Sequence, residues 1–188
     1  MVFTYPVPID RFEFVSRIGS RSSYGEVWTV RTKTFVPTSI NTPSVGFGPN
    51  TAFASKVLRI RPGVITREEI EEELRAISKV ATANHPNIVT VYGTTFQPDP
   101  RTDSYYILME LMDTSLDALL DELHKKYDFW DYWFHATVPY RYGFDPCDIV
   151  RGLEFIHGLD EIHRDLKPAN GIQDSTRAGS NSSSSGTS

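Results

Sequence analysis

One nine-residue stretch constrains this chain more than any other: Ile-His-Arg-Asp-Leu-Lys-Pro-Ala-Asn, residues 162–170. It fits the pattern H-R-D-L-x-x-x-N, in which Asp165 is followed at fixed distances by Lys167 and Asn170. A carboxylate can accept a proton, and an amide oxygen can bind a hard cation, so these side chains form a candidate site. A basic surface turn that contains Asp and Pro by chance is the alternative, and the residues upstream decide between the two.

The composition is that of a globular protein. The 188 residues suffice for one domain or one and a fraction, and 39% of them are hydrophobic, enough to build a core. The formal net charge of −5 argues against binding nucleic acid through its phosphates. Cys147 is the one cysteine, so no intrachain disulfide can form. Because neither a signal peptide nor a membrane-spanning run is evident, we expect a cytoplasmic protein without a membrane partner.

Two strands joined by a turn of small residues are predicted near the N-terminus. Residues 12–18 alternate loosely, residues 27–32 form the second strand, and Gly19 and Gly25 frame the turn. Free backbone N–H groups in such a turn can fold over phosphates. The fit to G-x-G-x-x-G-x-V is imperfect, because the middle glycine is missing and the turn is one residue too long; Val27 takes the place of the valine. Taken alone, this turn is better interpreted as an ordinary hairpin.

A third strand carries a lysine that stands out. Residues 34–52, rich in Pro, Thr, Ser, Gly and Asn, predict a long mobile loop insertion. The strand that follows, residues 51–60, contains Phe-Ala-Ser-Lys where the pattern V-A-I-K would place Ala54 and Lys56. A solvated strand lysine is the default interpretation of Lys56. Its order and spacing after the second strand favour a functional role.

Three helices and two more strands are predicted downstream. A helix over residues 67–81 begins with Thr66 and Glu69 at capping-box spacing. Its apolar face is predicted to consist of Ile70, Leu74 and Ile77. Residues 85–89, His-Pro-Asn-Ile-Val, lead into a fourth strand, and the β-branched and aromatic run 105–112 is the fifth. The other two helices are expected at residues 116–125 and 148–157, the latter limited by Pro146.

Taken together, these segments resemble a protein kinase. The resemblance covers about residues 12–172, and the run 109–117 is similar to the hinge of mitogen-activated protein kinase kinases. It implies an α+β fold, with an antiparallel-sheet N-lobe and hinge over residues 12–112 that holds one helix. An incomplete helical C-lobe over residues 113–172 follows, and residues 1–11 are an N-terminal extension. The implied activity is ATP-dependent phosphorylation of Ser or Thr on a protein substrate.

The resemblance also assigns roles to residues. Asp165 would orient the substrate hydroxyl and accept its proton, Lys167 would lie near the γ-phosphate, and Asn170 would bind Mg²⁺. Glu73 on the predicted helix would pair with Lys56, with a solvated acidic face as the plain alternative. The alternates for Glu73 are Glu69 and Glu72. The residues expected to contact or hold ATP are Gly19, Gly25, Val27, Ala54, Lys56, Glu73, Met109, Glu110, Met112 and Ile172.

The residues after Asn170 depart from the family pattern. Neither D-F-G nor Ala-Pro-Glu occurs there, and Asp174 is interpreted as a charge in a disordered Ser/Gly-rich tail, residues 173–188. We therefore expect a kinase truncated after the catalytic loop, with no activity or very weak activity. The alternatives are a pseudokinase-like module that binds nucleotide or a partner, and a non-functional fragment.

Two features of the second half predict interactions. The apolar faces of residues 116–125 and 148–157 would lack their usual cover, so a chaperone or another partner is expected there. Residues 127–144 are strongly aromatic. That cluster is either an interaction surface or local packing under an insertion.

Overall fold

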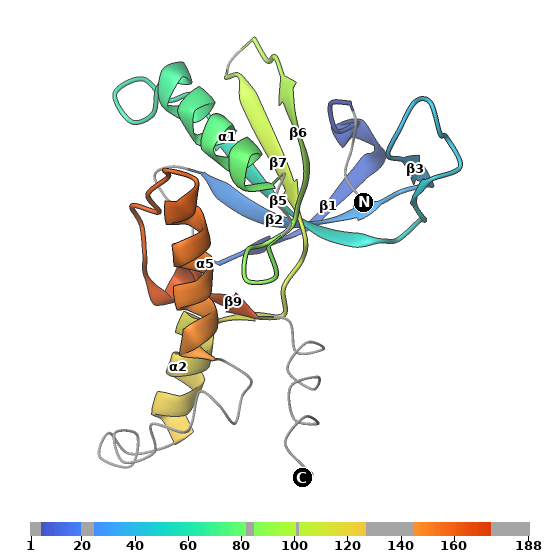
Figure 1. Ribbon diagram of the computed structural model, residues 1–188. Helices are drawn as coiled ribbons and strands as arrows, with labels where there is room; N and C mark the ends of the chain where they lie inside the picture. The colour runs from blue at the N-terminus through green and yellow to red at the C-terminus, as the bar shows by residue number, and fades with distance from the viewer. Residues whose placement is uncertain (1–4, 20–24, 82–84, 101, 127–144, 174–188) are drawn as a thin grey trace. The chain divides into compact units, whose positions relative to one another are not determined.

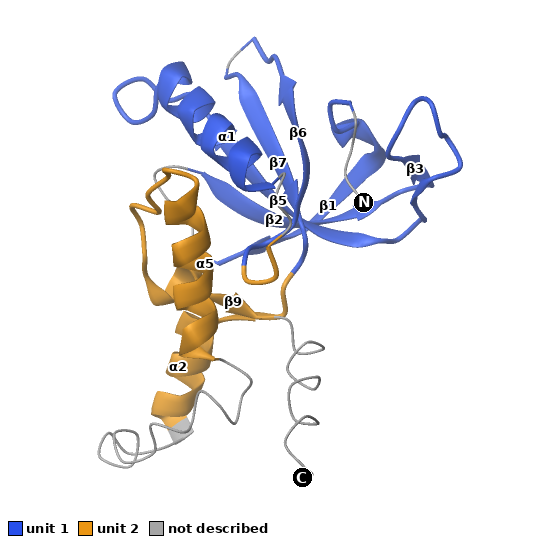
Figure 2. Ribbon diagram, viewed as in Figure 1, with its two compact units in different colours: residues 1–84, 88–111 blue, residues 85–87, 112–188 orange. Residues whose placement is uncertain are grey.

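The chain divides into two compact units, which are described separately (Figure 2). Unit 1 comprises residues 1–84 and 88–111, and unit 2 comprises residues 85–87 and 112–188. The computed structural model describes residues 5–19, 25–81, 85–100, 102–126 and 145–173. Within these ranges, no helix has both the length and the apolar character needed to cross a membrane.

Unit 1 is built on a five-stranded antiparallel sheet (Figure 1). In chain order its strands are β1 (Phe12–Ile18), β2 (Glu26–Thr32), β5 (Ala52–Arg59), β6 (Val91–Gln97) and β7 (Ser104–Met109). Their spatial order is β1-β2-β5-β7-β6, and every neighbouring pair is antiparallel. These bounds lie within a few residues of the predicted strands, because alternation of apolar residues is a local signal. The antiparallel N-lobe sheet is thus confirmed.

Helix α1 (Arg67–Ala81) covers one face of this sheet. The predicted capping box starts the helix: the Thr66 backbone N–H donates to Glu69 Oε2 at 2.7 Å, and the Glu69 backbone N–H donates to Thr66 Oγ1 at 3.2 Å. Ile70 is fully buried against the sheet. The core on this face consists of Leu58, Ile65, Ile70, Tyr105 and Ile107, flanked by Leu74 and Ile77. The predicted helix and its apolar face are confirmed.

The opposite face of the sheet has its own core, centred on Phe53 and Leu108. The segment 34–52, expected to be a plain loop, instead contains a short hairpin of β3 (Val36–Pro37) and β4 (Gly46–Phe47). Val36 is fully buried, and the Phe47 ring meets the Phe53 ring edge-on. The hairpin forms because these few apolar residues cover the sheet, although they are too few to give a periodic pattern.

The N-terminal residues also belong to this second core. Val7 is 2% exposed, and its backbone N–H donates to the Thr94 carbonyl at 3.1 Å. A short 3₁₀ turn, η1 (Ile9–Arg11), leads from there into β1. The segment expected to be an extension therefore packs on the sheet from Tyr5 onward, since Tyr5 also contacts the same core.

Unit 2 contains two helices, α2 (Leu116–Lys126) and α5 (Pro146–Gly158). Asp145 caps α5 by accepting from the Cys147 backbone N–H at 2.8 Å, and Pro146 occupies the first turn, where proline is tolerated. The helices meet through a small core of Leu119 and Leu123 with Ile149 packed against it. Val150, on the helix predicted for residues 148–157, is 62% exposed. The aromatic residues 127–144 and residues 174–188 of the predicted tail lie outside the described residues. Gln173, predicted to be the first residue of that disordered tail, is instead in strand β9 (Ile172–Gln173).

Candidate active site

Lys56 lies in the middle of β5 and points to the face that α1 covers. Strand residues alternate between faces, so Lys56 shares its face with Leu58, which belongs to the α1 core. Its Nζ atom lies 2.5 Å from Glu73 Oε1, and the two side chains are 32% and 29% exposed. The pair is therefore half-shielded from water between a strand and a helix.

Helix phase explains why Glu73 is the partner. Residues three or four apart lie on the same side of a helix, and Glu73 follows Ile70 by three positions and precedes Ile77 by four. Of the two alternates, Glu69 is engaged in the capping box with Thr66, and Glu72 is exposed. The acids of this helix thus divide among capping, solvent exposure and ion pairing.

Strand register gathers further predicted residues on the same face. Val27 lies directly opposite Lys56, and Ala54 lies directly opposite Met109. Cross-strand partners share a face, as do residues two apart on one strand such as Ala54 and Lys56. The structure therefore brings Val27, Ala54, Lys56 and Met109 together on the α1 side of unit 1.

The two glycines of the predicted phosphate turn have different conformations. Gly19 has φ of +67°, a left-handed conformation that favours glycine. At Gly25, a Cβ atom would lie 2.7 Å from the Val57 carbonyl oxygen, so only glycine fits beside β5. Residues 20–24, including Arg21, Ser22 and Tyr24, lie outside the described residues.

The predicted hinge follows β7. The Glu110 backbone N–H donates to the Thr90 carbonyl at 2.9 Å, so this N–H is engaged within unit 1. Glu110 belongs to unit 1, whereas Met112 is where unit 2 resumes.

In unit 2, the Asp165 carboxylate is held by two side chains of its own loop. Asp165 Oδ2 lies 2.9 Å from Lys167 Nζ and accepts from Asn170 Nδ2 at 3.0 Å. The same Asn170 amide nitrogen donates to the Asp165 carbonyl at 2.7 Å. Asn170 ends a 3₁₀ turn, η2 (Pro168–Asn170), and this turn brings it back beside Asp165. The predicted catalytic and metal-binding residues therefore form one cluster.

Local electrostatics keep this carboxylate ionised. The hydrogen bond from Lys167, followed by that from Asn170, lowers the pKa of Asp165 below its ordinary value. Because Asn170 uses its nitrogen on Asp165, its amide oxygen is the atom suited to a cation. The Asp165 backbone N–H donates to the His163 carbonyl at 2.8 Å. His163 is half-buried, and Arg164, which lies between His163 and Asp165, has φ of +58°.

A small sheet that the sequence did not predict holds the end of this loop. Strand β9 (Ile172–Gln173) pairs antiparallel with β8 (Thr114–Ser115), with Ile172 opposite Ser115. The Leu116 backbone N–H also donates to the Gly171 carbonyl at 2.7 Å. Two-residue strands carry no alternation, so nothing in the sequence signals them. Ile172, predicted to contact nucleotide, is 41% exposed.

His85 begins the His-Pro-Asn-Ile-Val segment, and histidine is a common metal ligand. Its ring stacks on the Phe155 ring with centroids 4.6 Å apart, and its Nδ1 accepts from the Asn87 backbone N–H at 3.2 Å. No group of three or more His, Cys, Asp or Glu side chains suited to a metal occurs in the part of the chain that the structure describes. The packing and hydrogen bond of His85 are those of a structural turn residue.

Comparisons with known proteins agree with this geometry. Residues 48–178, more than half of the chain, match the protein kinase domain family. Mitogen-activated protein kinase kinase kinase kinase 3 of Homo sapiens is 26% identical over 87% of this chain and 14% of its own length. Mitogen-activated protein kinase 13 of Arabidopsis thaliana is 30% identical over 55% of this chain and 26% of its own length. A probable cell division protein kinase of Encephalitozoon cuniculi is 28% identical over 86% of this chain and 42% of its own length.

This chain therefore spans less than half the length of each of these relatives. The resemblance of the hinge to mitogen-activated protein kinase kinases stays a prediction. The kinase motifs, the fold of unit 1 and the family match agree with one another. The chain belongs to the protein kinase domain family.

Proposed function

We propose that the chain derives from a protein kinase that transfers the γ-phosphoryl group of ATP to Ser or Thr on a protein. The observation that carries the proposal is the Lys56–Glu73 pair, 2.5 Å apart on the face that also presents Val27 and Ala54. A lysine held by a carboxylate keeps its cation in place for phosphate oxygens. The cluster of Asp165, Lys167 and Asn170 in unit 2 supports the same proposal.

The residues present fit ATP and Mg²⁺ by the chemistry of their donors. Lys56 would hold the α- and β-phosphates, and the Asn170 amide oxygen would hold one Mg²⁺. When bound, the metal ion neutralises phosphate charge. The lowered pKa of Asp165 means that its carboxylate is ionised at neutral pH and can accept a hydrogen bond from a substrate hydroxyl. Asp165 would thereby orient that hydroxyl, while Lys167 keeps the carboxylate in place.

For the 188-residue polypeptide itself, we propose weak or absent transfer. Residues 171–188 contain no D-F-G. The aspartate of that motif, which would be the second protein ligand of the metal, is therefore missing from this stretch. Each 1.4 kcal/mol of lost transition-state stabilisation lowers a rate about tenfold. The second candidate function is therefore a nucleotide-binding module, favoured by an intact Lys56–Glu73 pair without a complete metal site.

Two measurements separate these functions. The first is ATP-dependent phosphorylation of a generic basic protein, compared with Asp165→Ala. We expect no transfer above that control, and turnover well above it would contradict the proposed inactivity.

The second measurement is thermal stabilisation of the chain by Mg²⁺ and ATP. We expect stabilisation that is lost in Lys56→Ala; its absence from the unsubstituted chain would reject nucleotide binding, and absence of any melting transition would favour a non-functional fragment.

A further inference from the structure

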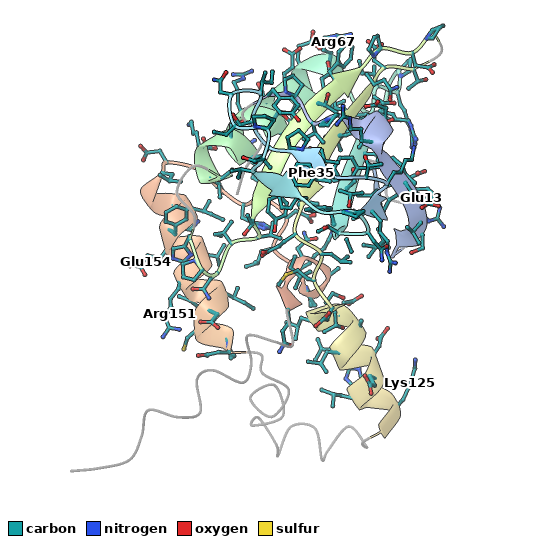
Figure 3. The ribbon with its side chains drawn as sticks, turned by 90° about the vertical axis from the view of Figure 1, so that its right-hand side faces the viewer. Glu13, Phe35, Arg67, Lys125, Arg151 and Glu154 are labelled. Atoms are coloured by element: carbon teal, nitrogen blue, oxygen red, sulfur yellow. The ribbon has the colours of Figure 1, made fainter. Side chains whose placement is uncertain are left out.

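Arg67, the first residue of α1, makes a second polar link between this helix and the sheet (Figure 3). Its Nη1 atom donates to the Tyr105 hydroxyl at 2.8 Å, and its Nη2 atom forms an ion pair with Asp103. Its Cζ atom lies 5.5 Å from the centre of the Phe96 ring, a cation–π geometry. One guanidinium therefore contacts three side chains on or next to β6 and β7.

The three partners are themselves held by the sheet. Phe96 and Tyr105 are directly opposite each other on neighbouring strands, and Tyr105 is only 6% exposed. Burial raises the pKa of Tyr105, so its hydroxyl stays neutral and available to Arg67. Asp103 accepts from the Asp99 backbone N–H at 3.4 Å within the β6–β7 connection. Arg67 thus meets two side chains of the sheet, Phe96 and Tyr105, and one of the connection beside it, Asp103.

The Arg67 contacts and the Lys56–Glu73 pair both join α1 to the five-stranded sheet, at different points along the helix. On α1, Arg67 and Glu73 are six residues apart, about 9 Å at the ordinary helical rise. On β7, Tyr105 and Ile107 share a face about 7 Å apart, and Ile107 lies opposite Lys56. Between these points, α1 touches the sheet through apolar residues such as Ile70 and Leu74, whose contacts are non-directional. Directional contacts at two points therefore add to this packing a restraint on how far the helix slides or turns.

We propose that Arg67 is a positioning residue: its fork to Asp103 and Tyr105 sets α1 so that Glu73 meets Lys56. The proposal rests on the proposed nucleotide function of that pair, and it adds that the affinity for MgATP depends on a residue that does not touch the nucleotide. Arg67→Lys cannot replace the fork, because a lysine carries its donors on one nitrogen atom, whereas Arg67 reaches Tyr105 and Asp103 from two.

The first experiment needs no nucleotide. The NMR signal of the Lys56 ammonium group is compared in the unsubstituted chain, Glu73→Gln, Arg67→Ala and Arg67→Lys. We expect both Arg67 variants to move the signal most of the way to its Glu73→Gln position. Tyr105→Phe, which keeps the ring but loses one acceptor, should move it less. Arg75→Ala, an exposed arginine on the same helix, should leave it unchanged.

The second experiment titrates MgATP well below the melting temperature of each variant. We expect Arg67→Ala to weaken binding about fivefold, and to add no further loss in a Glu73→Gln background, because both changes act through one pair. An unmoved Lys56 signal in Arg67→Ala, or fully additive losses, would overturn the proposal. If the unsubstituted chain does not bind MgATP, the proposed function fails, and the Lys56 signal alone still decides the role of Arg67.

Discussion

The two charged clusters of this chain are assembled in different ways. Lys56 and Glu73 come from a strand and a helix, lie 2.5 Å apart and are each about one-third exposed. Asp165 and Lys167 come from one short loop, lie 2.9 Å apart and are 63% and 52% exposed. The first cluster depends on how α1 packs on the sheet, whereas the second depends on hydrogen bonds between near neighbours in sequence. Substitutions far away in the sequence should therefore disturb the Lys56–Glu73 pair. Only substitutions within the loop should disturb the Asp165–Lys167 pair.

The largest effect is expected from Ile70→Ala. Ile70 is fully buried between α1 and the sheet, and removing its side chain leaves a cavity that should cost about 3 kcal/mol of unfolding free energy. Urea denaturation measures the loss. Ile40→Ala is the matched control, because Ile40 is 75% exposed in the hairpin segment and should change stability by less than about 0.5 kcal/mol. An equal loss of unfolding free energy in the two variants would show that the packing of α1 does not determine the stability of unit 1.

A smaller effect is expected from Glu73→Gln, which leaves the Lys56 cation without its carboxylate. A half-shielded ion pair of this kind contributes about 1 kcal/mol, and we expect that loss in urea denaturation. Glu72→Gln changes the neighbouring exposed acid and should be neutral within about 0.5 kcal/mol. The two clusters would not differ as described if Glu72→Gln were as destabilising as Glu73→Gln.

What the sequence predicted follows the same division between local and distant effects. The strands of the sheet and α1 were predictable because alternation and capping depend only on residues close together in the sequence, as at Thr66 and Glu69. The Asp165 cluster was predictable as a motif within one loop. The sequence could only rank Glu73 above Glu69 and Glu72, because the choice depends on how the whole helix meets Lys56.

Elements stabilised only by tertiary contacts were missed. The β3–β4 hairpin has strands of two residues, and Val36 is recognisable as core only once Phe53 lies beneath it. Val7 likewise gains its burial from the sheet rather than from any pattern in the first residues. Arg67 was not singled out, since a helix-start arginine is ordinary until its partners on β7 are known.

Ser55, next to Lys56 on β5, should give an effect of opposite sign. Its side chain is fully buried, and its hydroxyl has no hydrogen-bond partner among the residues that the structure describes. A buried hydroxyl without a partner is costly, so we expect Ser55→Ala to raise the free energy of unfolding by about 1 kcal/mol. Ser16→Ala, at an exposed position of β1, should change it little. Clear destabilisation by Ser55→Ala would mean that the hydroxyl has a partner in solution.

The smallest effect concerns the exposed cluster and is seen by titration rather than by unfolding. Lys167 and then Asn170 lower the pKa of Asp165. A carboxyl group with a depressed pKa in the folded state stabilises that state above its ordinary pKa, and this contribution is lost as the pH falls through the depressed value. Carboxyl NMR titration should therefore find Asp165 below the ordinary value for aspartate. Because the Asp165 side chain is 63% exposed, added salt should shrink the difference.

Substitutions in the loop test whether this shift has the local origin that the comparison requires. Lys167→Ala should return the pKa of Asp165 most of the way to its ordinary value, and Asn170→Ala should return it less, since its contribution is the second in size. Lys125→Ala removes an exposed lysine from α2 and should leave the titration unchanged. An equal response to Lys125→Ala would mean that general charge, rather than the short hydrogen bond from Lys167, governs Asp165. In that case the near neighbours of Asp165 in the loop would not be the cause of its lowered pKa, and the contrast with the Lys56–Glu73 pair would lose its basis.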